Sequence, residues 1–96
     1  MSENRTARVT VLIPEPLRAY TEGLSEVPVD AATVADALAH LVQEYPEIGP
    51  ELITDKGELR HGVVIAVDGR DIRFTGGLGT EVPAAGLIQI IAPMLV

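Results

Sequence analysis

Residues 87–96 constrain the fold more than any other stretch of the chain. They read Leu-Ile-Gln-Ile-Ile-Ala-Pro-Met-Leu-Val, and no charged residue follows Glu81. A dense run of apolar, β-branched residues is typical of a strand in a packed sheet. The sequence therefore predicts a strand over residues 87–91 and a C-terminal tail, residues 92–96, that leaves the sheet.

The length and composition of the chain favour one domain with an aliphatic core. Ninety-six residues fit the commonest domain size, and the chain holds two Tyr, one Phe and no Trp. We expect a single domain over residues 1–96. Residues 1–7, which lack an apolar pattern, are predicted to form a flexible N-terminus.

Composition also excludes several classes of site. With no Cys in the chain, disulfides and thiolate metal sites are ruled out, and His40 and His61 are too isolated to suggest a metal cluster. We expect no metal and no cofactor. A net charge of −7 argues against nucleic acid as a partner. The same charge fits either docking on a basic protein surface or simple solubility. No apolar run suits a signal peptide or a membrane span, so a cytoplasmic location is expected.

Two strands are predicted in the first third of the chain. Val9, Val11 and Ile13 alternate on one face of residues 8–13, which is a strand pattern. Prolines end this strand, and residues 17–20 are expected to form a turn or a short helical bend. Residues 24–29 repeat the alternation around Pro28, which lacks an N–H and so favours an edge strand. The two strands are expected to pair antiparallel.

One helix is predicted in the middle of the chain. Thr33, with Asp36 three residues later, resembles a capping box, and Pro46 ends the helix. The apolar side chains between them recur with helical spacing: Val34, Leu38, Leu41, Val42 and Tyr45. Residues 46–61 are expected to be a connector that covers part of the core.

The last third of the chain is predicted to be strands and turns. Residues 62–67 are apolar on both faces, which indicates a central strand. Asp68-Gly69 is a strong hairpin signal, and the hairpin is expected to return through residues 71–74. A flexible loop over 76–79 and a short strand piece over 80–82 precede the closing strand. One helix on a mixed sheet of four to five strands gives an α+β fold.

The residues alone do not indicate an enzyme. A catalytic site needs titratable groups that converge in a cleft, and no nucleophile–His arrangement has a local signature here. The glycines at residues 76–79 lack the Lys and Ser/Thr of a phosphate loop. We therefore expect a protein without catalytic residues.

These features in this order resemble the ThiS/MoaD family of ubiquitin-like sulfur carriers, over residues 8–93. Within the family, the chain looks most similar to the actinobacterial carrier that supplies sulfur for cysteine synthesis. The resemblance is carried by these stretches: Val9-x-Val-x-Ile-Pro14, Pro16-Leu-Arg18, Ala32-Thr-Val34, Leu41-x-x-x-Tyr-Pro46, Val64-x-x-Val-Asp-Gly-x-Asp-Ile-Arg-Phe74, Arg73-Phe-x-Gly-Gly-Leu78 and the strand that ends in Ile90-Ile91.

The resemblance implies a ubiquitin-like β-grasp fold and a non-enzymatic role. Such a carrier ends in Gly-Gly, and an E1-like adenylyltransferase of the MoeB/ThiF type activates its terminal carboxylate. The resulting thiocarboxylate donates sulfur to a sulfur-accepting enzyme. An apolar patch on the β-grasp body docks the partner. By resemblance Phe74, Arg73 and Ile91 are candidate members of that patch, and plain core packing is the other interpretation of Phe74.

The tail departs from the family pattern at the C-terminal positions whose carboxylate would be activated. Pro93, Met94, Leu95 and Val96 stand at or next to the place of the diglycine. Because Val is β-branched and Leu is bulky, we expect this tail to be a poor substrate for adenylation. An alternative role follows: a β-grasp interaction or regulatory module that has lost the chemistry and uses its apolar tail to hold a partner or to form a homo-oligomer.

Overall fold

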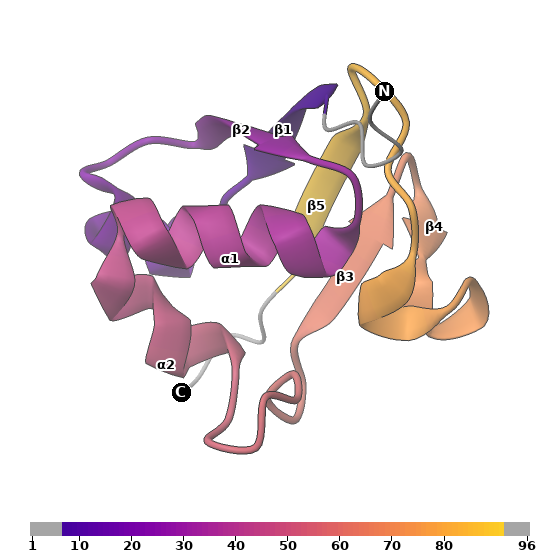
Figure 1. The fold of residues 1–96 in the computed structure, drawn as a ribbon. Coiled ribbons are helices and arrows are strands. Elements are labelled where there is room, and N and C mark those ends of the chain that lie inside the picture. Colours follow the sequence, from indigo (N-terminus) through magenta and orange to yellow (C-terminus); the bar gives the residue numbers. More distant parts are fainter. Residues whose placement is uncertain (1–6, 92–96) are drawn as a thin grey trace.

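The computed structural model describes residues 7–91, and it shows a five-stranded mixed sheet with helices α1 and α2 in front of it in the view of Figure 1. This arrangement confirms the predicted α+β class. The elements in chain order are β1 (Ala7–Leu12), η1 (Glu15–Thr21), β2 (Glu26–Ala31), α1 (Val34–Glu44), η2 (Pro46–Ile48), α2 (Gly49–Leu52), β3 (Val64–Val67), β4 (Arg70–Asp71), η3 (Ile72–Phe74), η4 (Gly77–Gly79) and β5 (Leu87–Ile91), where η marks a 3₁₀ helix.

The closing strand β5 lies in the middle of the sheet. The strand order is β2-β1-β5-β3-β4, with β5 parallel to β1 and antiparallel to β3. The predicted strand over residues 87–91 is therefore confirmed. The expectation that residues 62–67 form the central strand was wrong in two respects: β3 starts only at Val64, and it lies beside the centre.

The strands β1 and β2 pair antiparallel, and β2 is an edge strand, as predicted. The second strand starts two residues later than expected, at Glu26. Pro28 lies opposite Thr10, whose N–H donates to the carbonyl of Gly86 and not to β2. The proline therefore occupies a position where the β1–β2 ladder needs no donor.

Helix α1 covers one face of the sheet, and the predicted apolar stripe points to that face. Val34, Leu38 and Leu41 are buried, and the alternating residues of β1, β2 and β5 meet them from below. Thr33 accepts a hydrogen bond from the Asp36 N–H at 3.1 Å, which confirms the predicted cap. The helix ends at Glu44, two residues before Pro46.

The connector over residues 46–61 contains helical structure that the prediction missed. It includes η2 and α2, and both Ile48 and Leu52 are fully buried. Their spacing of four residues places both on the inner face of this short helical segment. Gly49 lets the segment approach α1, because a Cβ there would lie 3.2 Å from the Cγ1 atom of Val42. None of the helices within residues 7–91 is both long and apolar enough to cross a bilayer.

The Asp68-Gly69 turn is confirmed and is attached to β5. Both residues have positive φ, as this hairpin turn requires. The Asp68 carboxylate accepts a hydrogen bond from the Leu87 N–H at 2.9 Å. The expected strand over residues 71–74 was wrong, because β4 has only two residues and a 3₁₀ turn follows. Asp71 accepts the Arg73 N–H at 2.9 Å, which caps that turn and ends the ladder.

Two smaller expectations were also corrected. The glycine-rich loop contains η4, which is fixed by a 2.7 Å hydrogen bond from the Thr80 hydroxyl to the Gly77 carbonyl. The strand piece over residues 80–82 is a single bridge between Glu81 and Thr33. This loop supports α1, since the Val34 N–H donates to the Thr80 carbonyl at 3.0 Å.

Gly86 controls entry into β5, and its replacement tests the fold. A Cβ at this position would lie 2.8 Å from the Pro83 carbonyl oxygen and 2.9 Å from the Cγ1 atom of Val82. We expect Gly86→Ala to lower the free energy of unfolding by about 2–3 kcal/mol, measured by urea denaturation. Gly79→Ala is the matched control, because a Cβ there meets nothing within 4 Å. Equal stability of the two variants would contradict the proposed close approach at Gly86.

Candidate functional site

The face of the sheet opposite α1 is not covered by any helix described within residues 7–91. Strand residues alternate between the two faces, and one set of each strand is buried under α1. Cross-strand register places the other set side by side on the second face, which we call the open face. Its central residues are Thr10 and Leu12 of β1, Leu87, Gln89 and Ile91 of β5, and Val64 and Ala66 of β3.

Apolar side chains surround Gln89 on the open face. Leu87 is 39% exposed and Ile91 is 45% exposed, so both present aliphatic surface to solvent. Val64 lies directly opposite Ile91, and Leu12 lies opposite Gln89. We name the set Leu12, Val64, Ala66, Leu87 and Ile91 the open-face patch. Exposed apolar side chains that adjoin one another mark interaction sites more often than scattered ones do.

Charged side chains form two edges of the open face. On the β2 side, Arg8 pairs with Asp30 at 3.0 Å. On the β4 side, Asp71 lies opposite Ala66, and its carboxylate receives Arg73 Nη2 at 2.6 Å and Nε at 3.0 Å. An apolar centre with a polar rim is the usual anatomy of a protein–protein interface.

Phe74 is the most exposed large apolar residue among those described, at 83%. The Arg73 guanidinium carbon lies 5.9 Å from the centre of its ring. The interpretation of Phe74 as a core residue was therefore wrong. Phe74 ends η3, next to Arg73, and β3 separates this segment from β5.

Of the three predicted docking residues, Ile91 lies on the open face and Arg73 binds Asp71 at its β4 edge. Phe74 follows Arg73 in η3, and no contact of its ring with the open face is found among the described residues. The sequence interpretation missed Val64 and Leu87, which complete the centre. The apolar run around Val64 shows no alternation in the sequence, so only the register with β5 assigns Val64 to the open face. Pro93, Met94, Leu95 and Val96 lie outside the described residues 7–91.

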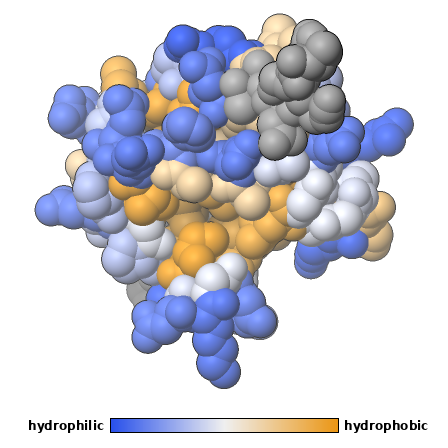
Figure 2. Space-filling model, in the orientation of Figure 1, coloured by the Kyte–Doolittle hydropathy of each residue, from blue (hydrophilic) through white to orange (hydrophobic). Residues whose placement is uncertain are grey.

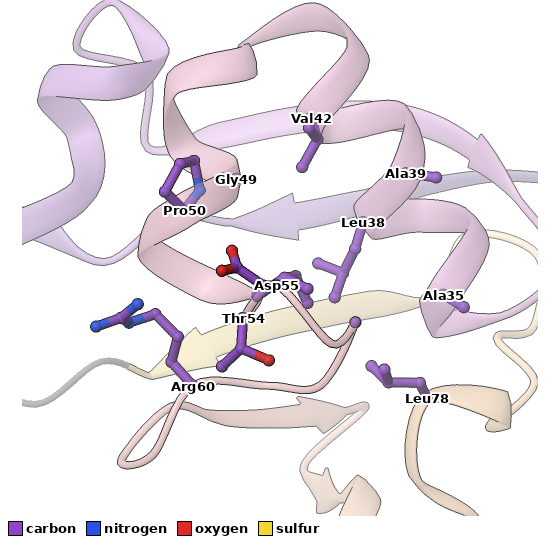
Figure 3. A pocket seen from close by; sticks show the side chains of 12 residues that line it. Ala35, Leu38, Ala39, Val42, Gly49, Pro50, Thr54, Asp55, Arg60 and Leu78 are labelled. Carbon is purple, nitrogen blue, oxygen red and sulfur yellow. The ribbon is translucent and has the colours of Figure 1, made fainter.

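A second apolar surface lies on the α1 side, as a groove between α1, α2 and η4. Figure 2 shows apolar residues gathered in this hollow, surrounded by hydrophilic ones. The groove has a volume of about 610 Å³, and Leu38, Val42, Ile53 and Leu78 contribute its aliphatic walls. The Arg60 guanidinium lies at the end away from Leu38 and Leu78 (Figure 3). Asp55 also lines the groove, but it forms no ion pair with Arg60 within 4.0 Å, and neither a His nor a Cys accompanies them among the described residues that line it.

No cluster of metal-ligating side chains occurs within residues 7–91. His40 and His61 are both exposed, and they lie on α1 and in the connector respectively. The only ion pairs in this part of the chain are the two that border the open face.

The Asp71–Arg73 pair can be tested by titration. Hydrogen bonds from the Arg73 side chain, and then from its backbone N–H, hold the pKa of Asp71 below its ordinary value of 3.8. A lowered pKa in the folded state stabilises the fold above pH 3.8, and this contribution is lost as the pH falls through the lowered pKa. We expect Arg73→Gln to raise the pKa of Asp71 towards 3.8, measured by carboxyl ¹³C NMR. Arg70→Gln, the control, should leave it unchanged.

Comparison with known proteins identifies relatives of the whole fold. Residues 11–95 match the ThiS family. The sulfur carrier protein CysO of Mycobacterium tuberculosis is 33% identical over 85 residues, which cover 86% of this chain and 91% of that protein.

Solved structures give the same relationship. A chain in the crystal structure of the Amycolatopsis orientalis BexX/CysO complex superposes with a TM-score of 0.85 at 30% identity, covering 92% of this chain and 98% of that chain. Small archaeal modifier protein 1 from Methanosarcina acetivorans superposes with a TM-score of 0.82 at 28% identity, covering 95% and 97%. The chain is therefore a member of the ThiS family of ubiquitin-like sulfur carriers.

Proposed function

We propose that this protein carries sulfur as a thiocarboxylate at the end of its tail and is the passive substrate of other enzymes. An E1-like adenylyltransferase of the MoeB/ThiF type joins the terminal carboxylate to AMP and releases pyrophosphate from ATP. A sulfide donor then displaces AMP and leaves sulfur on the acyl carbon. A sulfur-accepting enzyme takes that sulfur, and water hydrolyses the acyl–sulfur bond and so restores the carboxylate.

The position of β5 carries this proposal. The strand is paired with β1 over Leu87–Gln89 and with β3 as far as Ile91, its last described residue. Because Ile91 belongs both to this strand and to the open-face patch, a partner that binds the patch lies next to the segment that follows β5.

The open-face patch supports a docking role for the activating enzyme. Leu87 and Ile91 are the last exposed apolar side chains before the tail and lie on the same side of β5. Arg73 at the β4 edge and its neighbour Phe74 add a guanidinium and an aromatic ring, two groups that are enriched at interface hot spots. The BexX/CysO complex, in which a related CysO is assembled with BexX, is consistent with a partner on this fold.

The chemistry of the tail is tested by intact mass. We expect the chain with Gly-Gly added after Val96, incubated with a MoeB/ThiF-type enzyme, ATP and sulfide, to gain the mass of one sulfur-for-oxygen exchange. The chain as written should react poorly, because Leu95 and Val96 crowd the carbonyl. A second variant, Leu95→Gly/Val96→Gly, tests whether these two positions are the places of the glycines. If none of the three forms exchanges, the carrier role fails and the binding-module alternative gains support.

The docking role is tested by placing a charge in the open-face patch. We expect Ile91→Asp to raise the KM of the activating enzyme for its carrier at least tenfold, about 1.4 kcal/mol, because it buries a carboxylate in an apolar contact. The assay is pyrophosphate release with the Gly-Gly form. Leu24→Asp is the matched control: Leu24 is 44% exposed, like Ile91 at 45%, but it precedes β2 and lies off the open-face patch. Equal effects of the two substitutions would argue against docking at this patch.

A further inference from the structure

A hollow of about 430 Å³ lies where the chain leaves the sheet. It is bordered by Ile90 and Ile91 at the end of β5 and by Leu12 and Ile13 at the end of β1, with Arg18 and Glu26 beside them. Any partner that grips the tail passes this point. The residues around the hollow therefore meet the partner next to the chain exit.

Arg18 is fixed in position within η1. Its Nε–H donates to the Ile13 carbonyl at 3.0 Å, which holds the guanidinium beside the hollow. Its own carbonyl accepts the Gly23 N–H at 2.8 Å and the Thr21 hydroxyl at 3.3 Å. Because both ends of the residue are bonded, little side-chain entropy remains to be lost when a ligand binds.

The charge of Arg18 is not neutralised within residues 7–91. Arg8 and Arg73 each pair with a carboxylate, whereas Arg18 has no carboxylate oxygen within 4.0 Å among these residues. Glu26 borders the same hollow without forming such a pair. The Nη groups therefore remain as charge-assisted donors in a half-buried site, where a carboxylate would bind them more strongly than in water.

We infer that Arg18 is a positioning residue for the proposed carrier function, which binds an Asp or Glu carboxylate of the activating enzyme beside the chain exit. The planar guanidinium suits bidentate carboxylate binding. The contact would fix the direction in which the enzyme takes up the tail, while the open-face patch supplies most of the contact area. On a chain with a net charge of −7, an acidic group on the partner is favourable only where a cation is exposed to it.

This inference rests on the proposed function and is tested by activation kinetics on the Gly-Gly form. We expect Arg18→Met to raise the KM for the carrier about tenfold with kcat within twofold, and to weaken the salt dependence of KM. Arg18→Lys, which keeps the charge but loses the planar fork, should fall between Arg18→Met and the parent. Arg70→Met is the matched control. Arg70 lies in β4 opposite Val67, at the end of β3 away from the Val64–Ile91 pair, and it should have no effect.

A further variant separates recognition from a structural role. Glu26→Gln removes a carboxylate of the same hollow that would repel the acidic group of the partner, so we expect it to lower the KM. Thermal unfolding identifies any variant that is not folded at the assay temperature. If Arg18→Met is not folded, the KM of the folded Arg18→Lys variant tests the inference in its place. A folded Arg18 variant with an unchanged KM would overturn the inference, as would equal effects of Arg18→Met and Arg70→Met. If the parent Gly-Gly form is not adenylated at all, the proposed function itself fails.

Discussion

The rest of the structure depends on the placement of β5 between β1 and β3. A strand paired on one side only is bound by half as many hydrogen bonds, and its end frays readily. Here β1 pairs with β5 as far as Gln89, which lies opposite Leu12, and β3 pairs with it to the end of the described strand, where Ile91 lies opposite Val64. The point where the chain leaves the sheet is thus fixed relative to the body. Two local features hold the start of the strand: the Asp68 carboxylate on the Leu87 N–H, and the close approach of Gly86 to the Pro83 carbonyl.

The two faces of the sheet differ in what covers them. Helix α1 buries one face of every long strand, and this burial supplies most of the free energy of folding. The open face has no such layer within the described residues, so its apolar side chains do not complete a core. A partner that covers Leu87 and Ile91 gains the same kind of free energy that α1 gains on the other side. The groove between α1 and α2 is also apolar, but it lies in the other layer and is not next to the chain exit.

Much of this fold could be predicted from the sequence, because its signals are local. The alternation of Val9, Val11 and Ile13, the cap at Thr33 and the Asp68-Gly69 turn each depend on a few neighbouring residues, and each was confirmed. The misses have a different origin. Whether β3 or β5 is central depends on pairing between distant segments. Runs of apolar residues do not specify such pairing, since both strands satisfy the same pattern. The short α2 helix was missed because four residues show too little periodicity.

The difference between local signals and long-range pairing also determines how much of the candidate site could be predicted from the sequence. Phe74 could be singled out, but its exposure could not, because an isolated aromatic residue in an apolar stretch fits a core as well as a surface. Its exposure follows from the Asp71 cap, which ends β4 after two residues and turns the chain away from the sheet. Arg18 illustrates the opposite case. Its neighbours in the sequence indicate only a bend after two prolines, and its position beside Ile91 arises from the parallel pairing of β1 with β5. A cation that lies seventy residues from the tail in sequence therefore becomes its neighbour through one strand pair, so the pairing that fixes the exit also determines which charges surround it.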